Sequence, residues 1–177
     1  MKTGPLKRLI ATSSNPATPL HAVRTTVAAV VSYLIASLFR LPDPYWAAIS
    51  TLVVMQSTLG AALPISAQRF AGTAIGAAVG AAGDTWFDGG LWAFGIAVLL
   101  VGLFCAALRV ERGAYRYAGI TLAIVMLVPR SVSPWLIATH RFIEVSVGIA
   151  VGLVLSAVWP ERPSPTPAER TKEPSTQ

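Results

Sequence analysis

Long apolar runs separated by short polar segments make up most of this chain. They predict an all-α membrane protein with six transmembrane helices. A spanning helix needs about 17–25 residues, and the first, second, fourth and sixth runs reach that length. The expected spans are Ala22–Phe39, Tyr45–Leu63, Ser66–Ala82, Gly90–Leu108, Arg116–Val128 and Arg141–Trp159.

The third and fifth runs are shorter. Only 14 uncharged residues lie between Arg69 and Asp84, and 13 lie between Arg116 and Arg130. At ~1.5 Å per residue such a run covers about 20 Å, less than the ~30 Å hydrocarbon core. These spans therefore either hold a basic residue within the bilayer or thin it locally. A count of five spans, in which the third enters and leaves on one side, is the alternative.

The same phrase opens the third and the sixth runs. Each copy starts with Arg-Phe and carries glycines seven and eleven residues after the arginine, and the copies begin at Arg69 and Arg141, 72 residues apart. With three helices in each copy, the copies would cross the membrane in opposite orientations, as a 3+3 inverted repeat. Such repeats are common in transporters, whose substrate sites lie where the repeats meet.

Composition and charge support a membrane protein. The 177 residues are 54% hydrophobic and 12% charged, with mean hydropathy +0.60, whereas soluble domains carry roughly 25% charged residues. The net charge of +6 comes from basic residues that flank apolar runs, so anionic lipid explains it better than nucleic acid. With both termini cytoplasmic, only Arg40, Arg130 and Arg141 of the 14 basic residues fall on the opposite side, a positive-inside bias.

The two ends differ from the apolar region. Residues 1–21 are polar and broken by proline, and they lack the apolar core of a cleavable signal peptide. We expect them to be disordered. Residues 22–160 would form the transmembrane domain, and residues 161–177 a disordered, proline-rich cytoplasmic tail.

Two phrases together resemble the fusaric acid resistance (FUSC) and aromatic acid exporter family. They are Leu-Pro-Asp-Pro-Tyr-Trp-Ala-Ala at 41–48 and Arg-Phe-Ala-Gly-Thr-Ala-Ile-Gly at 69–76, with Arg-Phe-Ile-Glu at 141–144 and Gly148 in the last run. The resemblance covers about residues 20–160. It implies a multi-pass protein of the bacterial inner membrane that exports aromatic or other organic carboxylates. Plant malate channels are similar at a greater distance, as dimers of six-span subunits around an anion pathway.

This chain departs from the larger members of that family. Those members carry a soluble cytoplasmic region, and often a second membrane half, that the chain does not include. We therefore expect a homodimer or a larger homo-oligomer, embedded in the lipid bilayer.

Glycines recur at intervals of four in the two matched runs. Such spacing lets helix backbones approach closely in lipid. The arginine that opens each run shares the helical face of its glycines, so both arginines should point toward protein. The expected packing positions are Gly72, Gly76 and Gly80 in one run, and Gly148, Gly152 and Ser156 in the other.

Arg69 and Arg141 are the main candidates for substrate contact. A charge near membrane depth usually faces a cavity or a partner, and arginine binds carboxylates through two parallel donors. In one hypothesis both arginines line the pathway and attract organic anions. In the other they extend from helix ends to the membrane surface as anchors.

Other polar residues are weaker candidates. Glu144 stands three residues after Arg141 and would either pair with it or carry an exchanged proton. Asp43 precedes a proline at a helix start and is expected to cap that helix. Trp46 and Thr73 could contact an aromatic acid, as could Gln56, for which an interhelical hydrogen bond is an equal alternative.

The sequence does not favour an enzyme. It has no phosphate-binding loop, HExxH pair or Cys/His metal spacing, and its single cysteine, Cys105, is in an apolar run. His140 with Ser146 or Ser133 would be the best nucleophile–base pair, but no Gly-x-Ser-x-Gly turn accompanies it. We expect no cofactor, no metal and no nucleic-acid partner. Export of small organic anions is the favoured function; a passive anion channel and a non-transporting subunit that needs a partner protein are the alternatives.

Overall fold

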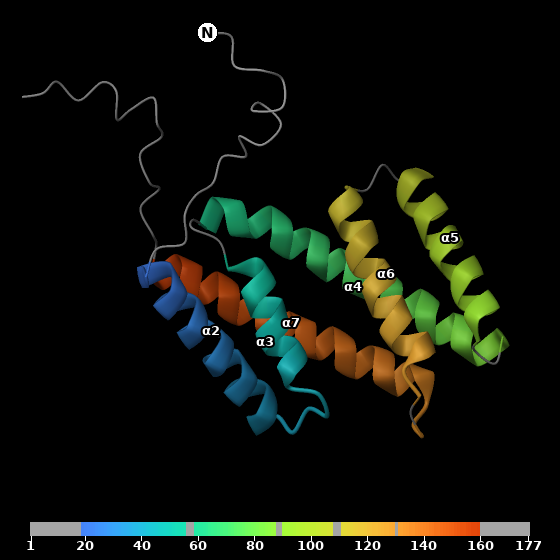
Figure 1. The fold of residues 1–177 in the computed structure, drawn as a ribbon, viewed down its shortest axis with the longest axis horizontal. Helices are drawn as coiled ribbons and strands as arrows, with labels where there is room; N and C mark the ends of the chain where they lie inside the picture. The colour runs from blue at the N-terminus through green and yellow to red at the C-terminus, as the bar shows by residue number, and fades with distance from the viewer. Residues whose placement is uncertain (1–18, 56–58, 88–89, 108–110, 130, 160–177) are drawn as a thin grey trace, which may run out of the picture.

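The computed structural model describes residues 19–55, 59–87, 90–107, 111–129 and 131–159. Every regular element in these ranges is an α-helix (Figure 1), which confirms the predicted all-helical class. The helices are α2 (Pro19–Leu38), α3 (Tyr45–Val54), α4 (Leu59–Phe87), α5 (Leu91–Ala107), α6 (Arg112–Leu127) and α7 (Pro134–Val158).

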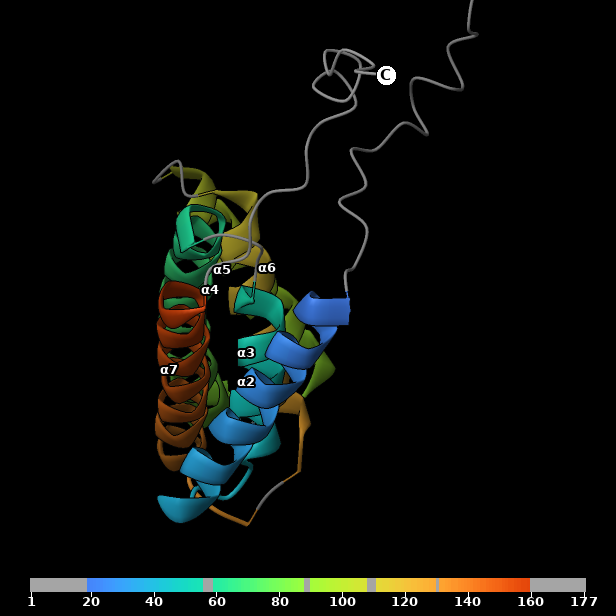
Figure 2. The same ribbon diagram turned by 90° about the vertical axis from the view of Figure 1, so that its left-hand side faces the viewer.

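The two longest helices, α4 and α7, lie against each other and form the centre of the molecule (Figure 1). Helices α6 and α5 pack along α4, while α3 and α2 pack along α7. Turned by 90°, the molecule has α4 and α7 on one side and α2 and α3 on the other (Figure 2). The centre is therefore built from helices of both halves of the chain.

The packing joins the first three helices to the last three. The third helix of each half packs on the second helix of the other half, so that α4 contacts α6 and α7 contacts α3. The first helix of each half also contacts the other half, at its third helix: α2 contacts α7 and α5 contacts α4. Among the described residues, the set of touching helices is unchanged when α2, α3 and α4 are exchanged with α5, α6 and α7.

The matched glycines lie at the closest of these contacts. A Cβ atom added to Gly76 would overlap the backbone carbonyl oxygen of Ala118 in α6, and one added to Gly148 would overlap that of Ala47 in α3. Only a residue without a side chain permits such an approach of two backbones. Gly72 lies against Ala114 and Tyr117, Gly80 against Val125 and Gly152 against Val54.

The predicted second span, Tyr45–Leu63, is wrong as a single helix. Helix α3 ends at Val54, and Met55 has an extended backbone with ψ of 111°. The predicted end of this span, Leu63, lies inside the next helix, α4, which also contains Pro64. At ~1.5 Å per residue, the ten residues of α3 cover about 15 Å, roughly half the hydrocarbon core.

The third run is also different from its prediction. It belongs to α4, which has 29 residues and is the longest helix of the described chain. Arg69 and Asp84 were used as limits of the apolar stretch, yet both lie within this helix. Charge does not end a helix when neighbouring protein surrounds the side chain, and Arg69 is surrounded in this way.

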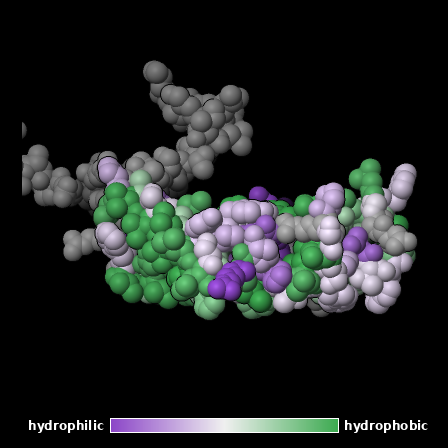
Figure 3. All heavy atoms as spheres, turned by 90° about the horizontal axis from the view of Figure 1, so that it is seen from below, coloured by the Kyte–Doolittle hydropathy of each residue, from purple (hydrophilic) through white to green (hydrophobic). Residues whose placement is uncertain are grey.

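Two described helices, α2 and α7, are long and apolar enough to cross a membrane individually, while α3 and α5 are apolar but shorter. Large apolar side chains of α5, such as Leu99, Leu103 and Phe104, are more than half exposed. Viewed from below, apolar surface gathers at the left end of the molecule, and hydrophilic side chains appear in the middle and toward the right end (Figure 3). Such a surface suits lipid, and the count of six spans stays a prediction.

Candidate functional site

Arg69 of α4 and Arg141 of α7 are buried where α3, α4, α6 and α7 meet. Their relative exposures are 5% and 2%. Both lie inside their helices, because α4 starts at Leu59 and α7 starts at Pro134. The hypothesis of surface anchors at helix ends does not fit this arrangement.

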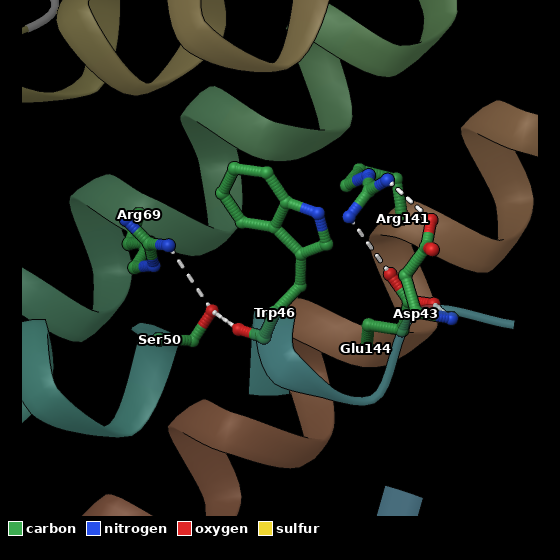
Figure 4. A network of polar contacts seen from close by, with 6 residues as sticks. All are labelled: Asp43, Trp46, Ser50, Arg69, Arg141 and Glu144. Carbon is green, nitrogen blue, oxygen red and sulfur yellow. Dashed lines mark hydrogen bonds and ion pairs between the residues drawn. The ribbon is translucent and has the colours of Figure 1, made fainter. Parts of the chain in front are cut away.

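Arg141 is held by two carboxylates. Its Nη2 donates to Oδ2 of Asp43 at 2.9 Å, and its Nη1 forms an ion pair with Oε2 of Glu144 at 3.1 Å (Figure 4). The expected pairing of Arg141 with Glu144 is thus present. Oε1 of Glu144 also accepts the backbone N–H of Asp43 at 2.9 Å. These three side chains carry two negative charges and one positive charge in their ionised forms.

The predicted capping role of Asp43 is wrong. Pro44 occupies the N-cap position of α3, and no side-chain hydrogen bond caps the helix. The carboxylate of Asp43 turns instead to Arg141, 98 residues away in the sequence. A charge-assisted hydrogen bond to a buried guanidinium is stronger than a bond to a neutral backbone amide, which explains the preference.

Arg69 has a different environment. Its Nη2 donates to the hydroxyl of Ser50 at 3.1 Å, and its guanidinium lies 5.0 Å from the ring centroid of Tyr117. The Ser50 hydroxyl in turn donates to the carbonyl oxygen of Trp46 at 2.7 Å. Within the described ranges no carboxylate lies at ion-pair distance from Arg69. Neutral groups alone therefore surround its charge in this part of the chain.

Trp46 lies between the two arginines (Figure 4). The guanidinium of Arg141 is 4.5 Å from the centroid of its ring. Each arginine thus packs over an aromatic ring from the second helix of the opposite half: Arg141 over Trp46 of α3, and Arg69 over Tyr117 of α6. Such cation–π contacts stabilise a desolvated guanidinium by about 2 kcal/mol.

A small cavity of about 10 Å³ separates these groups. Among the described residues, four buried nitrogens on its lining side chains have no hydrogen-bond acceptor: Nε of Arg69, Nε and Nη1 of Arg141, and Nε1 of Trp46. Nη1 of Arg141 has the ion pair with Glu144, so the other three are without a partner in this part of the chain. A buried donor without a partner costs about 1–3 kcal/mol. The cavity wall therefore offers positive charge and hydrogen-bond donors, which is the chemistry that a carboxylate requires. Its polar lining is completed by Thr73, Tyr117 and Thr121.

The structure brings together most of the predicted pathway residues. Trp46, Arg69, Thr73 and Arg141 line the cavity, and Glu144 contacts Arg141 outside it. Gln56 lies outside the described residues.

Sequence reasoning missed Tyr117 and Thr121. Tyr117 could have been found from the repeat, because it follows Tyr45 by the same 72 residues that separate the two arginines. Nothing in the sequence points to Thr121, since a single threonine in an apolar helix belongs to no motif.

The two serines considered as enzyme nucleophiles, Ser146 and Ser133, make hydrogen bonds to the backbone of α7. The Ser146 hydroxyl donates to the carbonyl oxygen of Phe142 at 2.7 Å, and the Ser133 hydroxyl accepts the N–H of Leu136 at the start of α7. Within the described ranges no three His, Cys, Asp or Glu side chains are grouped to hold a metal ion.

Known proteins resemble this chain over most of its length. "Uncharacterized transporter YdhK" of Salmonella typhimurium is 32% identical over 151 residues, covering 79% of this chain and 22% of the relative. "Uncharacterized transporter YdhK" of Escherichia coli K12 shows the same identity and coverage. "Inner membrane protein YeeA" of Escherichia coli K12 is 27% identical over 154 residues, covering 81% of this chain and 41% of the relative. The chain thus spans less than half the length of these relatives.

No solved structure matches the chain significantly. The sequence profile of one membrane protein family, described as fusaric acid resistance protein-like, matches residues 28–155. This range contains the cavity, both arginines and every matched glycine. The chain belongs to the fusaric acid resistance protein-like family.

Proposed function

We propose that this protein is an inner-membrane transporter that exports small organic anions, with aromatic carboxylates as the first choice of substrate. The observation that carries the proposal is the buried cavity with unpaired N–H donors between Arg69 and Arg141. The printed names of the YdhK relatives add support for transport as such.

Arg69 is the residue that we assign to the substrate carboxylate. A charge buried within a membrane protein is costly unless it meets a partner or a water-filled space. Arg141 already has Asp43 and Glu144, whereas Arg69 has a hydroxyl and an aromatic ring. A substrate carboxylate would supply the missing negative charge and accept two parallel N–H bonds. The rings of Trp46 and Tyr117 would pack against an aromatic substrate.

We propose further that the six helices form a 3+3 inverted repeat. The exchange of α2, α3 and α4 with α5, α6 and α7 leaves the set of helix contacts unchanged, as expected for two related halves. The cavity lies between α3 and α4 of one half and α6 and α7 of the other. This is the junction at which transporters built from inverted repeats bind their substrates.

Both described chain ends lie at one end of the helix bundle, where Nη1 of Arg24 in α2 donates to the carbonyl oxygen of Trp159 after α7. The distribution of basic residues makes this end cytoplasmic in our proposal. The cavity of about 10 Å³ has room for roughly one water molecule. Export therefore requires side chains or helices to move, and we expect the working unit to be a homodimer or a larger homo-oligomer.

Efflux of radiolabelled hydroxybenzoate from loaded proteoliposomes tests the proposal. We expect the wild-type chain to support efflux and Arg69→Gln to reduce it about tenfold or more, because a charge-assisted hydrogen bond is lost. Arg69→Lys should retain part of the activity, since it keeps the charge without the bidentate geometry. Arg112→Gln removes an exposed arginine at the start of α6 and is the matched control.

Two results would reject this function. Efflux that survives Arg69→Gln at the wild-type rate would remove Arg69 from the pathway. A folded wild-type protein that transports none of a panel of aromatic and aliphatic carboxylates would instead indicate a membrane subunit that needs a partner protein.

A further inference from the structure

A second and larger cavity lies on the other side of Arg141. Its volume is about 290 Å³, and we call it the vestibule. The loop between α2 and α3, the segment before α7 and the first turns of α7 enclose it. Its lining residues are Pro42, Asp43, Ser131, Val132, Leu136, Ile137, His140 and Arg141.

Arg141 is shared by the vestibule and the arginine cavity. It is the one residue that lines both spaces among the described residues. Its guanidinium packs over the ring of Trp46, which lines the arginine cavity only. The stacked pair therefore forms the partition between a space wide enough for a small organic acid and one that is not.

Asp43 holds this partition in place. Its carboxylate lines the vestibule, is 14% exposed, and accepts from Nη2 of Arg141 at 2.9 Å. Its backbone N–H is fixed by Glu144 at 2.9 Å. The positions that match Asp43 and Glu144 in the other half, 72 residues away, are Tyr115 and Gly72. Arg69 therefore has no equivalent pair of carboxylates. The arrangement of an arginine with two carboxylates occurs only on the vestibule side of the arginine cavity in the described residues.

We propose that Arg141 and Trp46 form a gate between the vestibule and the arginine cavity, and that the Asp43 carboxylate is its latch. A substrate carboxylate has the same chemistry as the Asp43 side chain and can take its place on Arg141. The gate then opens as the anion passes. This assignment rests on the proposed transport function for its purpose, but the closed and open forms of the gate can be measured without transport.

Access of a thiol reagent to the arginine cavity measures the gate directly. The single cysteine, Cys105, is first replaced by alanine, and Thr73→Cys then places a thiol in the cavity wall. The full chain in proteoliposomes is treated with a membrane-impermeant methanethiosulfonate, and the rate of modification is followed by mass spectrometry. Right-side-out and inverted preparations separate the two directions of approach.

We expect slow modification while Asp43 is present. Asp43→Asn should raise the rate about tenfold or more from one side only, because a charge-assisted hydrogen bond contributes more than the energy of a tenfold change in an equilibrium. Asp43→Glu restores a carboxylate and should keep the rate low. Asp84→Asn makes the same chemical change in α4 at a residue that lines neither cavity, and it should leave the rate unchanged.

A second pair of variants keeps the test decisive if Asp43→Asn does not yield folded protein. Trp46→Ala removes the ring from the partition and should speed modification, whereas Trp46→Phe keeps a ring and should not. Equal rates with and without the Asp43→Asn substitution, or equal increases from both sides, would overturn the gate. A one-sided increase in a protein that moves no carboxylate would retain the gate and reject the transport function instead.

Discussion

Phe70 of α4 and Phe142 of α7 lie in ring contact, with their centroids 4.9 Å apart and their planes inclined at 58°. They follow Arg69 and Arg141 directly, so they occupy matched positions in the two copies of the repeated phrase. Equivalent residues touch one another when they lie near a two-fold axis that relates two halves. The contact therefore places the proposed internal axis between α4 and α7, next to the arginine cavity.

The pair should be energetically coupled. A tilted aromatic pair contributes about 0.5–1.5 kcal/mol beyond the area that it buries. We expect Phe70→Leu, Phe142→Leu and the double variant to show a coupling energy in that range, measured as free energies of unfolding in detergent micelles. Phe70→Leu combined with Phe104→Leu on α5 is the control and should be additive. Additive losses for the first pair would contradict the contact.

The glycine contacts should respond to a single methyl group. Gly76→Ala would push a Cβ into the Ala118 carbonyl oxygen, whereas a Cβ at Gly119 has no atom within 4 Å. We expect Gly76→Ala to lower the free energy of unfolding by about 1–3 kcal/mol through overpacking. Gly119→Ala should leave it unchanged or raise it by up to about 1 kcal/mol through helix propensity. Equal tolerance of both changes in denaturant titrations would contradict the close approach of α4 and α6.

Loss of Arg141 should destabilise the protein more than loss of the Glu144 charge. Arg141→Gln removes the cation that two carboxylates contact, at a cost of about 3–5 kcal/mol in a buried setting. Glu144→Gln leaves Arg141 paired one-to-one with Asp43, and its amide oxygen can still accept the Asp43 backbone N–H. Thermal unfolding in one detergent compares the two. A larger loss in Glu144→Gln than in Arg141→Gln would contradict the charge arrangement.

Arg24 should stabilise the end of α7. It is fully buried in α2 and donates to the carbonyl oxygen of Trp159 at 2.8 Å. A cation at a helix C-terminus is also favoured by the helix dipole. We expect Arg24→Met to lower the free energy of unfolding by about 1–3 kcal/mol, and Arg24→Lys to lower it less. Hydrogen exchange in the last turn of α7 should accelerate in the Met variant. Unchanged exchange there would show that Arg24 does not hold this helix end.

Local patterns allowed several features to be predicted from the chain. The ion pair of Arg141 and Glu144 needs only a helix and a spacing of three residues, so the sequence could offer it as one of two alternatives for Glu144. The inward orientation of both arginines followed in the same way from their spacing to the glycines of their own helices. The end of the second span was not predictable in this way, because α3 ends at Val54 and Pro64 lies inside α4.

The sequence by itself determined that the chain is helical, which helix faces carry glycine and arginine, and that one phrase occurs twice. These properties depend on residues within a few turns of each other. Only the tertiary structure decided what each arginine meets. Asp43 reaches Arg141 across 98 residues, and Trp46 and Tyr117 reach their arginines from helices of the opposite half. Such contacts depend on the crossing of α3 and α6 over α7 and α4. The crossing is alike in the two halves, but the residues that it brings to each arginine differ, so that one arginine is balanced by carboxylates and the other is surrounded by neutral groups in the described chain.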